Sequence, residues 1–87
     1  PIRFEVYAYP NPFNPVCEIE FEISEVTGVR LEIYDISGRL VSRIIDEEMA
    51  AGLYRISWDG AENPSGTYLA RLTAGNKTEV RRLVLLK

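Results

Sequence analysis

The chain has 87 residues, of which 46% are hydrophobic and 26% are charged, a composition typical of one folded globular domain. Thirteen acidic and ten basic residues give a net charge of −3, which argues against a general nucleic-acid binder because such proteins need a strongly basic surface. The absence of histidine excludes His-dependent triads and imidazole zinc sites. This length leaves room for one domain, which we predict over residues 1–87. No apolar run approaches the roughly 20 residues of a membrane helix.

Apolar and polar residues alternate with a period of two through most of the chain, which is typical of half-buried strands. The last of these runs changes phase around Arg81 and Arg82, and we predict a β-bulge there. Residues 46–51 are expected to form a loop or a single helical turn. The pattern predicts seven strands, over residues 2–9, 17–24, 29–34, 40–45, 54–58, 67–72 and 78–86.

Glycine and proline mark the connections between these runs. Ser37-Gly38 and Gly75-Asn76 are typical of tight hairpin turns that need a positive φ. Proline has no N–H to give to a sheet, so Pro10, Pro12 and Pro15 predict an extended crossing between the first two strands. Seven short strands with regular turns predict an all-β fold, an antiparallel sandwich of two packed sheets.

Large apolar residues at inward positions define the expected core. Trp58 should be its centre, and Phe13 should close one open end of the sandwich. The chain should turn at Asp59-Gly60, where glycine permits the backbone conformation. The other core residues that we predict around Trp58 are Phe4, Ile19, Phe21, Leu31, Ile33, Ile56 and Leu72.

Three groups of residues have the chemistry for catalysis or metal binding, but we assign no catalytic, cofactor or metal site among them. Glu18, Glu20 and Glu22 share one strand face at spacings of about 6–7 Å, but a common solvated face gives no unlike pair of carboxyls for acid–base catalysis. Cys17 is in phase with core residues, so we predict a buried and inert thiol. Oxygen ligands in 46–48 and 59–63 do not follow the spacing of a known calcium loop.

Several distinctive segments follow one another along nearly the whole chain. They are Tyr9-Pro10-Asn11-Pro12-Phe13-Asn14-Pro15, Ile33 to Val41, Gly52-Leu53-Tyr54, Trp58-Asp59-Gly60, Ser65-Gly66-Thr67-Tyr68 and the basic, aliphatic end that closes on Lys87. In these segments the chain resembles the C-terminal Ig-like domains of large secreted bacterial proteins, and it is similar to the Ig-like module of the flagellar hook-capping protein and to type A sorting domains of type IX secretion. The resemblance implies an Ig-like sandwich of about seven strands.

The sorting resemblance implies a non-catalytic module that serves secretion, sorting or surface attachment of a larger bacterial protein. Its partners would be the secretion or surface machinery, and its location extracellular or on the cell surface. Because the chain opens on Pro1 rather than Met, we expect an excised or processed piece whose targeting segment lies upstream. The alternatives are a subunit that assembles with copies of itself through the edge strands 2–9 and 77–86, and a carbohydrate-binding module that uses Tyr7, Tyr9 and Tyr34.

The positive charge is concentrated at the end of the chain. Residues 1–76 carry six basic and twelve acidic side chains, whereas residues 77–87 carry four basic side chains and one acidic side chain, Glu79. An acidic partner could pair as an added strand beside this segment and be selected by the positive charge of the segment. The simpler interpretation is that these charges form ordinary solvated surface. The predicted interaction residues are Lys77, Arg81, Arg82 and Lys87.

Overall fold

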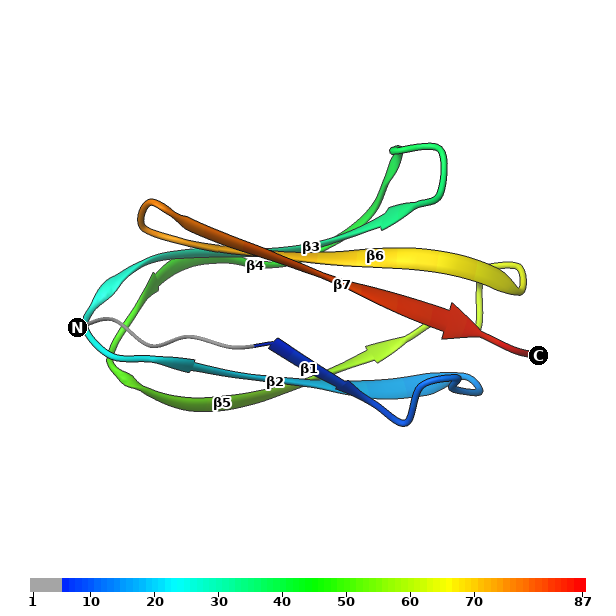
Figure 1. The fold of residues 1–87 in the computed structure, drawn as a ribbon, viewed down its shortest axis with the longest axis horizontal. Helices are drawn as coiled ribbons and strands as arrows, with labels where there is room; N and C mark the ends of the chain where they lie inside the picture. Colours follow the sequence, from blue (N-terminus) through cyan, green and yellow to red (C-terminus); the bar gives the residue numbers. More distant parts are fainter. Residues whose placement is uncertain (1–5) are drawn as a thin grey trace.

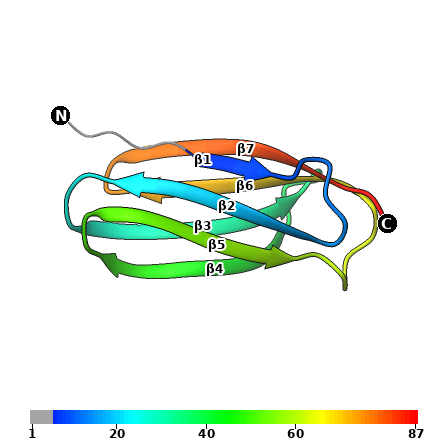
Figure 2. The ribbon, with the colours of Figure 1, turned by 90° about the horizontal axis from the view of Figure 1, so that it is seen from below.

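The computed structural model describes residues 6–87, which form two antiparallel sheets packed face to face (Figure 1). The seven strands are β1 (Val6–Tyr9), β2 (Val16–Ile23), β3 (Thr27–Asp35), β4 (Leu40–Met49), β5 (Gly52–Asp59), β6 (Gly66–Ala74) and β7 (Lys77–Leu85). One sheet has the order β1-β2-β5 and the other β4-β3-β6-β7, and Figure 2 shows the three-stranded sheet in front of the four-stranded one. The predicted all-β sandwich is confirmed, and no helix within residues 6–87 could cross a bilayer.

The core fills the space between the two sheets. Trp58 is 6% exposed and lies with fully buried residues of both sheets, as the alternation predicts. Ile56 is only partly buried, because it faces the core from the edge strand β5, and Phe4 lies outside the described residues. The predicted core residues that are buried are Ile19, Phe21, Leu31, Ile33 and Leu72.

Two local predictions are wrong. Residues 46–49 form neither a loop nor a helical turn but continue β4, in register with Thr27–Arg30 of β3. Backbone pairing with β3 satisfies these peptide groups, and as part of an edge strand they leave their acidic side chains in water. The irregularities in the β3–β4 pairing fall earlier, next to Leu31 and Ile33.

The bulge predicted at Arg81-Arg82 is also absent, since all nine residues of β7 pair with β6 in one continuous register. The change of phase has another cause. Arg81 lies on the same face of β7 as the buried Leu83 and Leu85, but it is exposed and forms an ion pair of 2.9 Å with Glu79. The core therefore covers the end of β7, at Leu83 and Leu85, and leaves most of the earlier part of the strand exposed to water.

The turns follow the predicted chemistry. Gly38 has a φ of 93° and Gly75 a φ of 60°, the left-handed conformations expected of the two hairpin turns. The carboxylate of Asp35 accepts hydrogen bonds from the main-chain N–H groups of Ser37 and Arg39, which closes the β3–β4 turn. The Ser37 hydroxyl donates to the same carboxylate, and this bond, supported by the two main-chain bonds, holds the pKa of Asp35 below its usual value.

Candidate functional site

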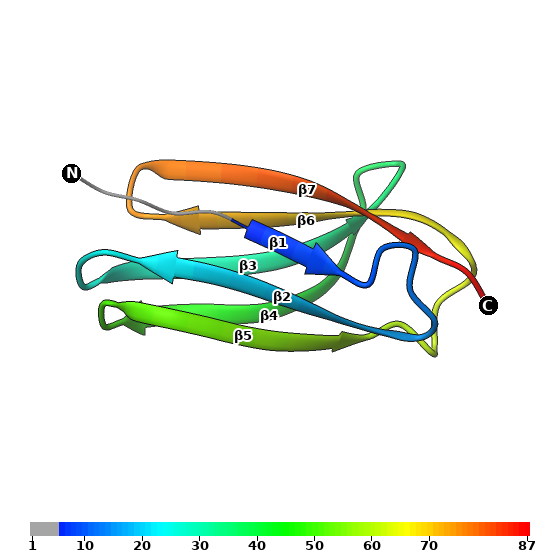
Figure 3. The ribbon, with the colours of Figure 1, turned by 60° about the horizontal axis from the view of Figure 1, so that its bottom comes forward.

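The distinctive sequence segments meet at one end of the sandwich, where residues 10–15 and the end of β7 lie side by side (Figure 3). Phe13 is 2% exposed, and its ring lies 5.7 Å from that of Trp58, so it closes this end as predicted. The Trp58 ring in turn contacts the ring of Tyr68 at 5.5 Å, edge to face. The Tyr68 hydroxyl donates 2.6 Å to the carbonyl of Pro64, the arrangement known as the tyrosine corner of Ig-like sandwiches.

Residues 11–13 lie along the outer edge of β7 and pair with it. The side-chain amide of Asn11 donates to the carbonyl of Arg82, and its oxygen accepts from the N–H of Val84, both at 2.9 Å. The N–H of Phe13 donates to the carbonyl of Val84, and its own carbonyl accepts from the N–H of Leu86. The extended crossing predicted from the prolines therefore covers the edge of β7 from Arg82 to its end, and Leu86 after it.

The turn after Trp58 approaches this pairing closely. The N–H of Gly60 donates 2.8 Å to the carbonyl of Pro15. A side chain at Gly60 would bring its Cβ to 3.1 Å from a methyl group of Leu85 and 3.5 Å from the Phe13 ring. Glycine is thus needed here for close approach of the backbone to the core.

Lys87 ties the end of the chain to the same turn. Its Nζ donates to the carbonyls of Ala61 and Asn63 at 2.6 and 2.8 Å, and its N–H donates to the hydroxyl of Ser65. A lysine ammonium has three donors, and two of them are used on these carbonyls. The segments 10–15, 58–65 and 82–87 therefore form one structure, which we call the motif end.

The four predicted interaction residues do not form one patch. Lys77 begins β7 at the opposite end from Lys87, and ten residues of extended chain span about 33 Å. Arg81 and Arg82 are both exposed but point to opposite faces of β7, since successive strand residues do. Arg82 pairs with Leu69 of β6 and so lies on the outer surface of the four-stranded sheet.

Within the described residues, Glu18 and Glu20 are paired with a cation, and Cys17 lies in the core. Arg55 pairs with Glu18 at 3.5 Å and with Glu20 at 3.0 Å, so these carboxylates share one cation on the outer surface of the three-stranded sheet. Cys17 is completely buried, and burial raises the pKa of its thiol to about 11, which keeps it protonated and unreactive. No three metal-ligating side chains come together within residues 6–87.

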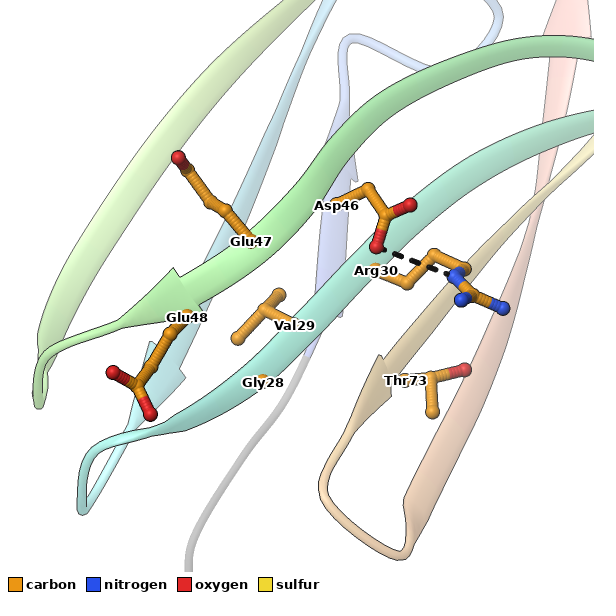
Figure 4. Close-up of a pocket in the computed structure, with 7 residues that line it drawn as sticks. All are labelled: Gly28, Val29, Arg30, Asp46, Glu47, Glu48 and Thr73. Carbon is orange, nitrogen blue, oxygen red and sulfur yellow. Dashed lines mark ion pairs between the residues drawn. The ribbon is translucent and has the colours of Figure 1, made fainter.

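A shallow hollow of about 420 Å³ lies at the other end of the four-stranded sheet (Figure 4). Gly28 is one of the residues that line it, and nothing lies within 4 Å of where a Cβ at Gly28 would be. Arg30 and Asp46 form an ion pair at 3.6 Å on its rim, and Glu47 and Glu48 point away from each other. Asp46, Glu47 and Glu48 are thus spread over two faces of β4.

A buried carboxylate on the outer surface of the four-stranded sheet was missed by sequence reasoning. Glu32 is 1% exposed and accepts hydrogen bonds from Tyr34, Arg43 and Arg71 at 2.8, 2.9 and 3.2 Å. Burial disfavours its charge, but the three hydrogen bonds outweigh burial and lower the pKa of Glu32. No signal in the alternation marks it, because only the strand order brings Arg43 and Arg71 to its two sides.

The tyrosines of the predicted carbohydrate-binding platform lie on different sheets. Tyr34 is on β3, whereas Tyr7 and Tyr9 are on β1 of the other sheet. The guanidinium of Arg71 covers the Tyr34 ring at 4.8 Å from its centroid. Tyr34 and the tyrosines of β1 therefore belong to different sheets, and a shared platform of the three is not supported.

Comparison with known proteins identifies the family. Residues 7–86 match the family model described as the secretion system C-terminal sorting domain. Among solved structures, the chain is similar to dimeric latent PorU from Porphyromonas gingivalis, with a TM-score of 0.75 and 21% identity over 99% of this chain, and it spans only 9% of that protein. A search of curated proteins finds no match. The match over almost the whole chain, which includes the motif end except Lys87, shows that the chain belongs to the C-terminal sorting domains of type IX secretion.

Proposed function

We propose that residues 1–87 are the export signal of a larger protein, read in the folded state by a type IX secretion machinery that carries the attached protein across the outer membrane. The observation that carries this proposal is the family match over residues 7–86. The motif end supports recognition of a fold rather than of a linear peptide. Its three segments are far apart in the sequence and become one surface only when the sandwich is folded.

The proposal assigns recognition and no chemistry to this domain, and an extracellular or cell-surface location to the protein that carries it. The described carboxylates and the one thiol support this, since Glu18 and Glu20 are held by Arg55 and Cys17 is buried. Among the predicted interaction residues, Arg82 is the best placed for a partner, because its side chain is exposed on a sheet surface. Neither the self-assembling subunit nor the carbohydrate-binding module is supported by the family match.

A reporter fusion tests this function directly. Residues 1–87 are joined to the C-terminus of a fluorescent protein that already reaches the periplasm, in a bacterium with type IX secretion and in a strain that lacks the machinery. We expect surface-associated or released reporter only in the first strain, and none when the domain is omitted. Retention of the fusion in the periplasm of both strains would contradict the proposal.

A further inference from the structure

The outer surface of the four-stranded sheet presents two rows of side chains across all four strands. The registers place Leu40, Tyr34, Leu69 and Arg82 in one row and Arg43, Glu32, Arg71 and Val80 in the next. We call these eight residues the arginine face. Three arginines accompany a single carboxylate, and that carboxylate is buried beneath Arg43 and Arg71.

This face has a hollow with an apolar floor. A depression of about 270 Å³ is lined by Tyr34, Gly38, Leu69, Arg71 and Val80. Val80 is 46% exposed and Leu40 is 41% exposed, although both belong to strands of a folded sheet. Exposed apolar residues beside tyrosine and arginine are the composition found at the centre of protein interfaces.

The arginine at the centre of this face is held in place before any partner arrives. Arg71 donates to Glu32 at 3.2 Å and to the Tyr34 hydroxyl at 2.7 Å, and its guanidinium stacks on the Tyr34 ring. Its side chain nevertheless remains 44% exposed. An exposed guanidinium with a fixed position loses little conformational entropy when it binds a carboxylate.

The arginine face and the outer surface of the three-stranded sheet differ in the sign of their charge. The three-stranded sheet presents Glu18, Glu20 and Glu22 with Arg55 as their cationic neighbour. An acidic partner would be attracted to the arginine face and repelled from the opposite face, so charge alone fixes which side it approaches. Four strands spaced about 4.8 Å apart and about 30 Å long offer roughly 600 Å² in all, and the two rows of the arginine face make up about half of it, which is the size of a transient contact rather than a permanent one.

We propose that the arginine face is the docking surface for a protein of the secretion machinery, one that presents carboxylates around an apolar side chain. The apolar side chain enters the hollow beside Val80 and Leu69, and the carboxylates meet Arg71 and Arg82. This inference rests on the proposed function and names the surface by which the folded signal is read. A transient contact suits a signal whose carrier must leave the machinery after export.

The reporter fusion described above tests the inference with paired variants. Arg82→Glu and Val80→Glu change the arginine face, and we expect each to lower surface reporter by about tenfold or more. Arg82→Lys keeps the charge and should retain most of the export. The matched controls are Arg81→Glu, the next residue on the opposite face of β7, and Leu53→Glu, an apolar residue 67% exposed on the other sheet. Both controls should stay within about twofold of the wild type.

Folding and self-association are measured on the purified chain. Each variant should melt within about 5 °C of the wild type, and if Val80→Glu does not, Val80→Thr replaces it as the milder loss of apolar surface. The wild type should sediment as a monomer. Normal export of folded Arg82→Glu and Val80→Glu would overturn the inference while leaving the proposed function intact. The inference would also be overturned if the wild type were a dimer that these two changes dissociate, because the arginine face would then bind a second copy of the chain. Failure of the wild-type fusion itself would instead contradict the proposed function, and the inference would fail with it.

Discussion

The side-chain oxygen of Asn11 accepts a hydrogen bond of 2.9 Å from the main-chain N–H of Val84, a residue 73 positions further along the chain. The same side chain donates to the carbonyl of Arg82, so it replaces two backbone groups of a neighbouring strand. Pro10 and Pro12 on either side have no N–H to offer, and the asparagine supplies the pairing that they cannot. The proline-rich motif is therefore explained as protection of a sheet edge that would otherwise invite another chain.

Removing the Asn11 side chain should weaken the domain through this pairing. In Asn11→Ala, the loss of two hydrogen bonds should lower the free energy of unfolding by about 1–3 kcal/mol, measured by urea denaturation. Asn14→Ala is the matched control, because Asn14 is likewise exposed and precedes a proline, but within residues 6–87 its side chain forms neither of the two bonds that Asn11 makes to β7. Equal stabilities for the two variants would show that the edge pairing contributes nothing.

Gly28 and Gly60 provide a second test. Neither has a positive φ, and they differ in what surrounds them. Gly60→Ala places a methyl group 3.1 Å from Leu85 and should destabilise the fold by about 1–3 kcal/mol, the usual effect of overpacking. Gly28→Ala places the same group in open space within a strand and should be neutral or slightly stabilising. Thermal unfolding of both variants decides the matter, and a Gly60→Ala domain as stable as the wild type would mean that the turn can move away from the core.

The sequence predicted the parts of this fold that depend on local patterns. The alternation in β2 and β3, the burial of Trp58 and Phe13 and the turn at Gly38 all follow from residue spacing. The extension of β4 did not, because acidic residues that favour water are tolerated at a sheet edge. The Glu32 cluster and the split of Arg81 from Arg82 depend on which strands are neighbours and on which half of β7 the core covers. A single sequence contains neither fact.

Glu32 should make the stability of the domain depend on pH. The pKa of Glu32 is lowered in the folded state, so in acid the unfolded chain binds more protons than the folded chain. The contribution of Glu32 to the free energy of unfolding is therefore lost as the pH falls from about 4.3, the usual pKa of a glutamate, through the lower pKa of the folded state. At neutral pH, Glu32→Gln should cost about 1–3 kcal/mol, because two arginines lose a charged acceptor. Urea unfolding from pH 2.5 to 7 should show this gap between wild type and variant shrinking toward acid.

The control for this titration is Glu22→Gln, which removes an exposed carboxylate from the other sheet and should change stability by less than about 0.5 kcal/mol. A gap between wild type and Glu32→Gln that stayed constant over the whole pH range would exclude Glu32 as the titrating group.

Lys87 should hold the motif end in order while adding little to global stability. Lys87→Met keeps the aliphatic stem but removes the donors to the carbonyls of Ala61 and Asn63, and on this exposed surface the loss should be about 1 kcal/mol or less. The local effect should be larger. The N–H of Asn63, which donates to the carbonyl of Gly60, should exchange with deuterium faster in this variant. Lys77→Met, at the opposite end of β7, should leave that exchange unchanged.

If the motif end is part of the export signal, the Lys87→Met fusion should also reach the surface less efficiently than the Lys77→Met fusion. Unchanged exchange at Asn63 together with normal export would mean that the contacts of Lys87 neither order this end of the sandwich nor help the machinery to recognise it.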